Sequence, residues 1–532
     1  MLSGCTVQEP ERAVLATEVL ADESAPRAWA AAPADGGTSE STPLPIGTGW
    51  GPTADQIERA RRLVGRLSLR ERAGQVIVAR YAGTAAPSAL VNGLHLGGVV
   101  AFTDNVRSAD QIRSSNRALQ RSARAAGRRF PVTVGIDQEG GLVERFTSGT
   151  RFPAFMTAGA AARPRLTRQA STASGAELAG LGFTTDYAPV ADVTVGPADP
   201  VIGSRSAGSR PRTVAEHAVA AARGYQAAGV VPTLKHFPGH GSLTADSHRT
   251  LPVQRKSVRE LERSDYLPFR AGVDAGLPSV MVGHIDVRAV DPGMPASLSR
   301  AVITGELRDR LGFDGLVVTD ALDMAGVAAR FSSGQAAVRA LSAGADVVLM
   351  PPSPRAARDG IVRAVEDGRL SSDRLVQAAT RQVAVLLHRR AAGTTPRPPG
   401  SGRAVAERWS AAAVTSVAGP CRGRLVGRKV QVRGAASDVR RFRAAASAAG
   451  LKIGRRGTTV RLVGSAGGPV TGEVLVALDR PYVLGAARAR VRLATYGSTP
   501  GAMRALVDVL LGRAPAPGRL PVPVPGVPRP GC

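Results

Sequence analysis

The sequence lacks long apolar runs and is poor in aromatic residues. No stretch approaches the ~20 consecutive apolar residues that a membrane-spanning helix needs, so such a helix is not expected. Phe, Trp and Tyr make up 4% of the chain, whereas hydrophobic residues as a whole make up 43%. A sizeable core is therefore expected, packed mainly with Ala, Val and Leu. At 532 residues, the chain is long enough for two or three domains.

Acidic residues are also in short supply, because 42 Asp and Glu face 69 Lys and Arg, for a formal charge of +27. The imbalance is largest after residue 400, where 22 basic residues face 5 acidic ones. Such a surface attracts polyanions. The sequence has no nucleic-acid recognition motif and no aromatic residues interleaved with the basic ones, so a specific nucleic-acid partner is not expected. Anionic cell-wall polymers, lipid headgroups and a merely solvated surface remain as alternatives.

Histidine is sparse as well, yet three of the seven histidines fall in one loop. The apolar stretch 230–234 predicts a short buried strand, and the residues after it predict a loop rich in ionisable groups. That loop reads Lys235-His236-Phe237-Pro238-Gly239-His240-Gly241 and continues to Asp246-Ser247-His248. A buried strand that ends in such a loop is how a parallel α/β barrel builds an active site.

The spacing of Asp246 and His248 suits a proton-transfer pair. In a loop, a carboxylate two residues away can bond one imidazole nitrogen and leave the other to exchange a proton with a substrate oxygen. In a purely structural alternative, Asp246 caps a turn and His248 is a surface residue. A metal site made of His236, His240, Asp246 and His248 is a further alternative. The Pro and Gly residues between the first two histidines disfavour the helix that a zinc-binding pair at this spacing would need.

Short apolar runs alternate with helical or loop stretches from residue 75 onward. The runs are 75–80, 97–103, 131–137, 183–189, 231–237, 279–286, 315–320 and 345–350. Helices are predicted between several of these runs, over 109–126, 213–229, 258–275 and 299–311. Two more helices, which start after Thr53 and Ser68, are predicted before the first run. Eight βα units in ~250–350 residues is the scale of a TIM (β/α)8 barrel. Charged residues such as Asp137, Lys235 and Asp320 end the runs, which is where such a barrel has its catalytic face.

The histidine loop resembles the signature loop of the glycoside hydrolase family 3 β-N-acetylhexosaminidases, the bacterial NagZ-like enzymes. Its length and fixed spacing make the resemblance specific, and it extends over most of the chain. The resemblance implies an α/β protein, with a TIM (β/α)8 barrel followed by a smaller α/β sandwich domain.

Composition and this resemblance together divide the chain into four parts. Residues 1–49 are expected to be a lipobox remnant and flexible tether, 50–391 the catalytic barrel, 392–402 a linker, and 403–532 the sandwich domain with a Pro-rich tail. In the last part, strands are predicted over 429–432, 460–463, 474–478 and 490–494, and helices over 435–449 and 501–511.

The resemblance assigns the nucleophile to Asp320 and the acid/base role to His248, paired with Asp246. A retaining glycosidase needs a carboxylate near the anomeric carbon and a proton-transfer group about 5 Å away. Asp323 is the rival carboxylate. It lies about one helical turn beyond Asp320 and is expected to cap a helix or form a salt bridge.

Five further residues are expected to bind the sugar: Asp137, Arg145, Arg205, Lys235 and His236. The stretch 134–146 resembles the substrate-binding stretch of the family, in which Asp137 would accept hydrogen bonds from sugar hydroxyls and Arg145 would support it. A plain ion pair between these two residues is the alternative. The family usually has Arg where this chain has Leu142, which puts any contact from that position in doubt.

The remaining sugar contacts come from two other loops. Arg205 resembles the arginine that helps to hold the N-acetyl sugar, and Lys235 and His236 match the paired ligands of sugar hydroxyls. A charged donor to a hydroxyl in a partly dry pocket stabilises the complex by roughly 1.5–3 kcal/mol. His95, His217, His284 and His388 are expected to have no role in the reaction.

The first residues resemble the end of a bacterial lipoprotein signal. Leu2-Ser3-Gly4-Cys5 matches the point at which Cys5 would become the lipidated N-terminus, although the charged and apolar regions that should precede it are missing. The chain as given is therefore expected to start downstream of the true start. If Cys5 is lipidated, Cys421 and Cys532 are left as a pair that could form a disulfide outside the cytoplasm. The expected location is extracytoplasmic, as a cell-membrane lipoprotein or a secreted protein.

These residues together predict a retaining exo-β-N-acetylglucosaminidase that needs no metal and no cofactor. The resemblance implies GlcNAc-containing cell-wall fragments or chitooligosaccharides as substrates. Phosphorolysis stays open, because a neutral imidazole repels phosphate less than a glutamate would. A β-glucosidase of the same family is disfavoured by the histidine loop, which those enzymes lack. A catalytically inactive, wall-binding lipoprotein is the alternative from another class.

Overall fold

The computed structural model describes residues 46–420, 422–464 and 471–527. Cys5, Cys421 and Cys532 lie outside these ranges, so the lipidation and the disulfide stay predictions. Most of the tether predicted over residues 1–49 also lies outside them. Within the described residues, no helix combines the length and the apolar character needed to cross a membrane.

Two short helices precede the barrel, and each begins where a local cap predicts. Helix α1 (Ala54–Gly65) starts after Thr53, whose hydroxyl accepts the N–H of Gln56 while the Gln56 side chain accepts the N–H of Thr53. Helix α2 (Leu69–Gln75) starts after Ser68 with the same reciprocal arrangement. These capping boxes satisfy backbone donors that the first helical turn leaves unpaired.

The barrel strands fall within the predicted apolar runs. In chain order they are β1 (Ile77–Arg80), β2 (Gly98–Ala101), β3 (Thr133–Ile136), β6 (Thr185–Asp186), β7 (Val231–Pro232) continued by β8 (Leu234–Phe237), β10 (Ser279–Val282), β12 (Leu316–Thr319) and β13 (Val348–Leu349). Parallel pairing runs β13-β1-β2-β3-β6-β7 and β8-β10-β12. A parallel bridge between Val318 and Val347 links the two sets. Almost every strand residue is buried, because helices cover the outside and side chains fill the inside.

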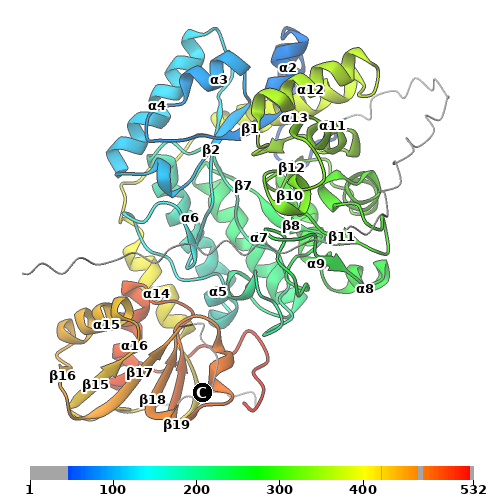
Figure 1. Cartoon of the computed structure of the whole chain (residues 1–532). Helices are drawn as coiled ribbons and strands as arrows, with labels where there is room; N and C mark the ends of the chain where they lie inside the picture. The colour runs from blue at the N-terminus through cyan, green and yellow to red at the C-terminus, as the bar shows by residue number, and fades with distance from the viewer. Residues whose placement is uncertain (1–45, 421, 465–470, 528–532) are drawn as a thin grey trace, which may run out of the picture. The chain divides into compact units, whose positions relative to one another are not determined.

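Helices surround these strands (Figure 1). They are α3 (Ser88–Leu94), α4 (Ala109–Ala125), α5 (Met156–Ala161), α6 (Pro164–Gly180), α7 (Pro211–Ala227), α8 (Val258–Arg263), α9 (Leu267–Asp274), the π-helix η4 (Ala301–Arg310), α10 (Ala325–Ala328), α11 (Ser333–Ala343), α12 (Pro354–Glu366) and α13 (Ser372–Ala392). The single helix predicted over 258–275 is wrong, because α8 ends before Ser264 and α9 starts afresh. Pro268, in the first turn of α9, has no N–H to continue a preceding helix.

Shorter elements lie in the loops that connect the barrel strands and helices. They are the hairpin strands β4 (Gln138–Gly140) and β5 (Val143–Glu144), the paired strands β9 (Val253–Gln254) and β11 (Asp286–Val287), and the 3-10 turns η1 (Thr103–Asn105), η2 (Gly203–Arg205) and η3 (Ala296–Leu298). Of the residues expected to bind sugar, Asp137 and Arg145 flank the β4–β5 hairpin and Arg205 is the last residue of η2.

The C-terminal part is a second α/β unit. Its elements are α14 (Arg403–Ala413), β14 (Thr415–Ala418), β15 (Lys429–Arg433), α15 (Ala436–Ala448), β16 (Lys452–Ile453), β17 (Thr458–Val463), β18 (Thr471–Ala477), η5 (Pro481–Leu484), β19 (Arg488–Ala494) and α16 (Pro500–Leu510). The described strands form a sheet in the order β14-β19-β18-β17-β15-β16, parallel except for β14. The four strands and two helices predicted for this part are confirmed, whereas α14, β14, the short β16 and η5 were not predicted.

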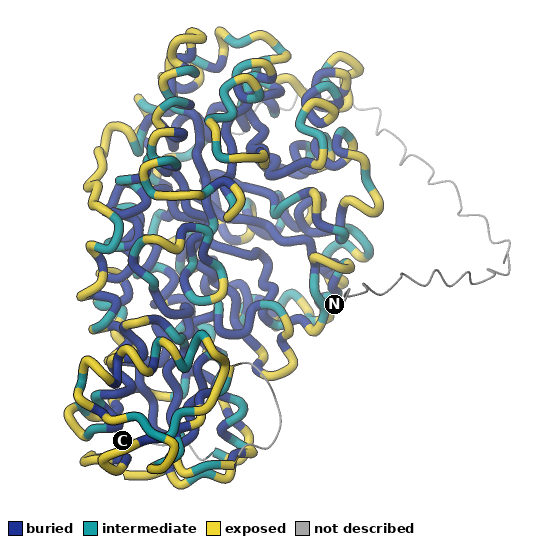
Figure 2. The backbone as a smooth tube through the Cα atoms, turned by 60° about the vertical axis from the view of Figure 1, so that its left-hand side comes forward, coloured by how far each residue is buried: buried dark blue, intermediate teal, exposed yellow. Residues whose placement is uncertain are grey.

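Both faces of the C-terminal sheet are covered. On one face, Phe442 of α15 and Leu506 of α16 pack with Val476 in an apolar cluster. On the other face, Leu475 packs with Trp409 and with barrel residues such as Phe155. The barrel and the sheet therefore share buried surface and belong to one compact unit (Figure 2).

Candidate active site

A pocket of about 330 Å³ lies where the barrel strands end. Its ionisable lining consists of Arg80, Asp137, Glu139, Arg145, Arg205, Lys235, His236, His240, His248, Asp320 and Asp323. The structure thus brings together seven residues that the sequence predicted for catalysis or sugar binding, although they span 184 positions from Asp137 to Asp320. Asp246 lies beside His248 and is hydrogen-bonded to it. Parallel strands end at the same edge of a barrel, which is why residues so distant in the chain meet.

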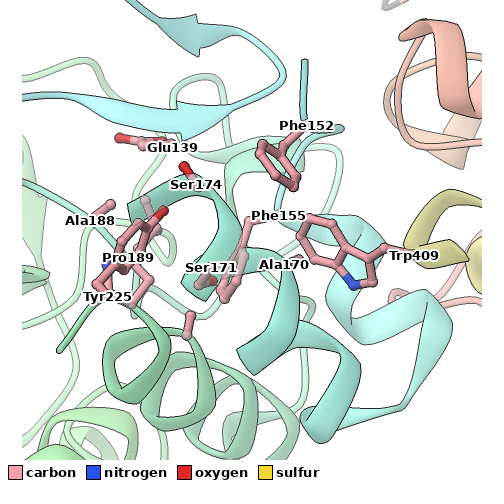
Figure 3. Close-up of a pocket in the computed structure, with 12 residues that line it drawn as sticks. Glu139, Phe152, Phe155, Ala170, Ser171, Ser174, Ala188, Pro189, Tyr225 and Trp409 are labelled. Carbon is pink, nitrogen blue, oxygen red and sulfur yellow. The ribbon is translucent and has the colours of Figure 1, made fainter. Parts of the chain in front are cut away.

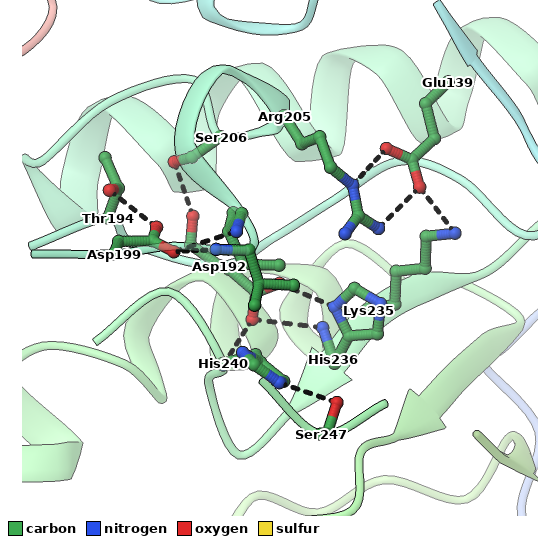
Figure 4. A network of polar contacts seen from close by, with 12 residues as sticks. Glu139, Asp192, Thr194, Asp199, Arg205, Ser206, Lys235, His236, His240 and Ser247 are labelled. Carbon is green, nitrogen blue, oxygen red and sulfur yellow. Dashed lines mark hydrogen bonds and ion pairs between the residues drawn. The ribbon is translucent and has the colours of Figure 1, made fainter. Parts of the chain in front are cut away.

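One wall of the pocket is a buried network of charges (Figure 4). The Lys235 ammonium lies 2.7 Å from a carboxylate oxygen of Asp137 and 2.7 Å from one of Glu139. Nε and Nη2 of Arg205 each donate to Glu139 at 2.9 Å. Burial raises the pKa of Glu139, but Arg205 and Lys235 outweigh it and hold that pKa well below its usual range. Burial likewise lowers the pKa of Lys235, but the carboxylates of Asp137 and Glu139 outweigh it and raise that pKa above its ordinary value, so the ammonium stays charged.

Glu139 is a residue to which the sequence assigned no role. Behind it lies a cavity of only about 20 Å³, whose walls include Phe155, Tyr225 and Trp409 (Figure 3). Bulk water is largely excluded from that side, which strengthens the attraction between Glu139 and its cations. The signal was its position two residues after Asp137, in a stretch already singled out.

Arg145 does not form the ion pair with Asp137 that was an alternative from the sequence. Asp137 is bonded to Lys235, and the Arg145 guanidinium lies over the ring of Phe102, 4.7 Å from its centroid. The buried Nε of Arg145 has no hydrogen-bond partner among the described residues. A buried donor left unpaired costs free energy, so this nitrogen is suited to a ligand oxygen. Leu142 is 70% exposed in the hairpin turn and does not line this pocket.

A second buried carboxylate, Asp192, was also missed from the sequence. One of its oxygens lies 2.7 Å from Nδ1 of His236. The other accepts the backbone N–H groups of His236 and His240, at 3.2 and 2.7 Å. Burial raises the pKa of Asp192, but these two histidines outweigh it and lower that pKa. Because Nδ1 of His236 is engaged, Nε2 is the nitrogen left for a ligand in the pocket.

His240 lies next to this pair and is buried. Its Nε2 is 2.9 Å from the hydroxyl of Ser247, and burial lowers its pKa. The metal alternative used His236 and His240 together, but Nδ1 of His236 is bonded to Asp192 and Nε2 of His240 to Ser247, so only one nitrogen of each ring is left. Within the described parts of the chain, no three or more His, Cys, Asp or Glu side chains are grouped to hold a metal ion.

Asp246 and His248 form the hydrogen-bonded pair that their spacing predicted. Oδ1 of Asp246 lies 2.8 Å from Nδ1 of His248 and accepts the His248 backbone N–H at 2.9 Å. Slight burial raises the pKa of Asp246, but the hydrogen bonds from His248 lower it below its ordinary value. The His248 side chain is 61% exposed, so its other nitrogen can meet both a substrate and water.

Asp320 follows β12 and accepts the N–H of Ala321 at 2.8 Å. Burial raises the pKa of Asp320, but His236, His284 and this hydrogen bond outweigh it and hold the carboxyl ionised. His284, to which the sequence gave no role, bonds the Ala321 carbonyl at 2.9 Å and so fixes the backbone beside Asp320. Asp323 is half-buried in the same pocket, and burial raises its pKa. Asp320 is therefore the better ionised of the two carboxylates.

This architecture matches known proteins in sequence. A family model described as the glycosyl hydrolase family 3 N-terminal domain matches residues 68–385. The chain is 34% identical over 320 residues to β-hexosaminidase A of Pseudoalteromonas piscicida, which covers 55% of this chain and 54% of that protein. It is 35% identical over 320 residues to β-hexosaminidase LpqI of Mycobacterium tuberculosis, which covers 59% of this chain and 79% of that protein. The chain thus spans about half the length of the first relative.

It also matches solved structures. A glycoside hydrolase family 3 β-N-acetylglucosaminidase from Paenibacillus sp. str. FPU-7 superposes with a TM-score of 0.78 at 29% identity, over 87% of this chain and 100% of that one. The β-glucoside phosphorylase BglX superposes with a TM-score of 0.76 at 20% identity, over 89% of this chain and 97% of that one, and shares the fold. The predicted barrel with a smaller α/β domain is confirmed. Because the family model matches more than half of its length, the chain belongs to glycosyl hydrolase family 3.

Proposed function

We propose that this protein is a retaining exo-β-N-acetylglucosaminidase. The observation that carries the proposal is one pocket lined by a buried, ionised Asp320 and by His248 with its carboxylate partner. A retaining mechanism needs those two chemical roles on one substrate. The Paenibacillus structure is that of a β-N-acetylglucosaminidase, and the curated relatives are β-hexosaminidases, which supports the same activity here.

The charged wall of the pocket would hold the terminal sugar. Asp137 accepts hydrogen bonds from sugar hydroxyls, and Lys235 and His236 donate to them. Arg145 and Arg205 complete the contacts, with Arg205 on the N-acetyl side. Because the lysine and the carboxylates neutralise each other and are already in place, little free energy is spent on ordering them when the sugar binds.

The reaction then proceeds in two steps on the sugar. His248 donates a proton to the leaving oxygen while the Asp320 carboxylate bonds to the anomeric carbon, and a glycosyl-enzyme forms. A water molecule enters, His248 takes its proton, and the water oxygen displaces Asp320 from the same carbon. Asp246 holds the imidazole in one tautomer through both steps. The chain's own residues suffice for this scheme.

The substrates proposed are GlcNAc-containing cell-wall fragments or chitooligosaccharides. A steady-state comparison of 4-nitrophenyl N-acetyl-β-glucosaminide with 4-nitrophenyl β-glucoside tests the sugar. We expect strong preference for the first; equal rates or a preference for glucose would favour a β-glucosidase. Turnover of neither sugar, with wall binding intact in wild type and in Asp320→Asn, would favour a non-catalytic wall-binding protein.

Trapping the intermediate tests retention and the nucleophile together. A 5-fluoro N-acetylglucosaminyl inhibitor should leave one sugar on the protein, and peptide mapping should locate it on Asp320. Asp320→Asn should take up no label, whereas Asp323→Asn should still be labelled at Asp320. A label on Asp323 would reverse the assignment of the two carboxylates.

The acceptor in the second step is a separate question. His248 is neutral when it acts as the base, so phosphate is not repelled as it would be by a carboxylate. We propose water as the acceptor. Product analysis in phosphate buffer should give free GlcNAc; GlcNAc-1-phosphate would show phosphorolysis instead.

We also propose that the protein is exported and lipid-anchored through Cys5, and that its basic C-terminal domain meets anionic cell-wall polymers. The Leu2-Ser3-Gly4-Cys5 match and the excess of basic residues after residue 400 support this. Expression in a bacterial host behind a complete lipoprotein signal should give a membrane-bound protein that incorporates labelled palmitate. Cys5→Ser should be released and unlabelled; labelling of that variant would contradict the proposal.

A further inference from the structure

The C-terminal domain provides no side chain to the described lining of the pocket, yet it touches the loop that carries Arg205. This loop, residues 187–210, connects β6 to α7 and is called the Arg205 loop below. Its position decides where the Arg205 guanidinium lies, because Arg205 reaches Glu139 through a two-bond fork that tolerates little displacement.

The part of the Arg205 loop just before Arg205 is organised around the buried carboxylate of Asp199 (Figure 4). Asp199 accepts the backbone N–H groups of Val201, Ile202 and Gly203 at 3.0, 2.8 and 2.9 Å. It also accepts the hydroxyl of Thr194 at 2.8 Å. These bonds make residues 199–203 a tight turn. Because Arg205 follows two residues later, a shift of this turn also shifts Arg205.

Two consecutive residues of the C-terminal domain, Asp479 and Arg480, contact this turn and the residue after it. The hydroxyl of Ser204 donates to the carboxylate of Asp479. The Arg480 guanidinium donates to the backbone carbonyl of Asp199 at 3.4 Å. Its aliphatic part covers Gly203, where an added Cβ would lie only 3.0 Å from Cδ of Arg480. Gly203 also has a φ of +48°, so glycine suits this close approach on both counts.

We propose that Asp479 and Arg480 are positioning residues of the sugar pocket. They hold the turn before Arg205, and Arg205 in turn meets Glu139 and the bound sugar. The C-terminal domain is then part of the binding machinery even though it does not touch the substrate. This inference rests on the proposed function, which gives Arg205 its sugar contact.

Other contacts keep the C-terminal domain docked when these side chains are changed. The Ala154 N–H donates to the Tyr496 carbonyl at 3.1 Å, and the Arg519 N–H donates to the Ala160 carbonyl at 2.9 Å. An apolar cluster is shared as well. Removal of the Asp479 carboxylate should therefore loosen the Arg205 loop without releasing the domain.

The test uses the full chain and 4-nitrophenyl N-acetyl-β-glucosaminide. Ser204→Ala and Asp479→Ala should each lower kcat/KM about tenfold, the scale of one lost hydrogen bond to a charged group. Asp479 also lies 3.7 Å from Nε of Arg480, so the double variant should be no worse than Asp479→Ala alone, in which the bond to Ser204 is already lost. Asp479→Asn keeps an oxygen acceptor for Ser204 and should recover most of the activity. Arg480→Ala should lower kcat/KM several-fold through the contact with Asp199.

The division of the loss between kcat and KM distinguishes a positioning role of Asp479 and Arg480 from a merely structural one. The single variants should divide their loss between kcat and KM in the same proportion as Arg205→Ala does. Arg504→Ala, which breaks an exposed ion pair with Glu407 elsewhere in the C-terminal region, is the matched control and should behave as wild type. Thermal unfolding checks that each variant is folded.

The outcomes separate this inference from the function beneath it. Wild-type kcat/KM in Ser204→Ala and Asp479→Ala, together with a strong defect in Arg205→Ala, would overturn the positioning role and leave the proposed function standing. Wild-type activity in Arg205→Ala would overturn the sugar contact itself. If Asp479→Ala does not fold, Ser204→Ala decides, because it removes a single oxygen from the same bond.

Discussion

Two Asp–His pairs flank the pocket, and they differ in surroundings rather than in geometry. In the buried pair, Asp192 lies 2.7 Å from Nδ1 of His236; in the exposed pair, Asp246 lies 2.8 Å from Nδ1 of His248. The His236 side chain is 9% exposed and the His248 side chain 61%. The same chemical couple therefore occurs once as a fixed part of the wall and once at the rim.

The number of hydrogen bonds explains this division. Asp192 also accepts two backbone N–H groups, one from His236 itself and one from His240, so its carboxylate fixes the start of the loop. Within the described residues, the carboxylate of Asp246 accepts hydrogen bonds from His248 alone. A group that must pass protons to a leaving oxygen and take them from water benefits from exposure, whereas a sugar ligand benefits from rigidity. We therefore infer that burial, not the residue pair, decides the role.

The largest effect should come from removing the exposed imidazole. His248→Ala should lower kcat/KM on a GlcNAc disaccharide about 10²–10⁴-fold, the usual contribution of a general acid/base. The loss should be smaller with 4-nitrophenyl N-acetyl-β-glucosaminide, because nitrophenolate leaves without a proton.

Added azide distinguishes the two histidines in that experiment. Azide needs no general base, so it should restore turnover of the nitrophenyl substrate by His248→Ala and yield the glycosyl azide. His236→Ala should instead raise KM and gain nothing from azide. Azide rescue of His236→Ala alone would reverse the roles of the two pairs.

For the free energy of unfolding, we expect the buried pair to matter more than the exposed one. Asp192→Asn leaves buried donors poorly matched and should lower the free energy of unfolding by about 2–4 kcal/mol. Asp246→Asn, at the surface, should lower it by less than about 1 kcal/mol. Urea unfolding of both variants measures the difference, and equal losses would contradict the contrast drawn between the pairs.

The stability difference between wild type and Asp192→Asn should also depend on pH. The pKa of Asp192 is lower in the folded protein than in the unfolded chain, so its contribution is fully present above the unfolded value of about 3.9. It is lost as pH falls further, through the folded pKa. The stability difference between the two proteins should therefore shrink as the pH falls below about 3.9, and a difference that does not change with pH in this range would argue against an ionised Asp192.

A more modest effect is expected when the exposed pair loses its charge but keeps its shape. Asp246→Asn should lower kcat/KM about tenfold, because the amide no longer selects one tautomer of His248. Unlike Asp192→Asn, it should leave KM for the nitrophenyl substrate close to wild type. An unchanged kcat would mean that His248 does not depend on Asp246.

The smallest effect concerns a buried imidazole with a neutral partner. His217 bonds the Thr167 hydroxyl at 2.8 Å, and burial lowers its pKa to about 4. The unfolded chain binds this proton below about pH 6.5, so stability should fall by about 1 kcal/mol between about pH 7 and about pH 5.5 from this residue alone. Other buried histidines such as His95, whose pKa is also lowered to about 4, add to the slope, so His217→Gln should reduce it only by this amount in urea unfolding. An unchanged slope would contradict the contribution of His217.

Much of the barrel could be predicted from the sequence for a local reason. Parallel strands that are covered on both sides give near-continuous apolar runs, so each strand could be predicted from its run. The caps at Thr53 and Ser68 involve residues only three positions apart. The Asp246–His248 bond is equally local, because its partners are two positions apart. The break between α8 and α9 was missed because the apolar pattern continues through it.

The buried half of the site could not be predicted in the same way. Glu139 bonds Arg205 from 66 positions away, and Asp192 bonds His236 from 44 positions away. His284 lies in a strand-like apolar pattern, yet it bonds the Ala321 carbonyl 37 positions later. These residues meet because the barrel closes, and the spacing of neighbouring residues in the sequence does not predict which distant residues will meet.

By itself, the amino-acid sequence determined the order of strands and helices, the family resemblance and the identity of the exposed Asp–His pair. These depend on periodicity and on contacts between near neighbours, which are written into the chain directly. Only the tertiary structure decided which carboxylates are buried and paired, that Asp192 and Glu139 support the wall, and that Asp479 reaches the Arg205 loop. Burial and charge pairing are properties of the folded surroundings, because they depend on which distant strand ends are brought to the same rim.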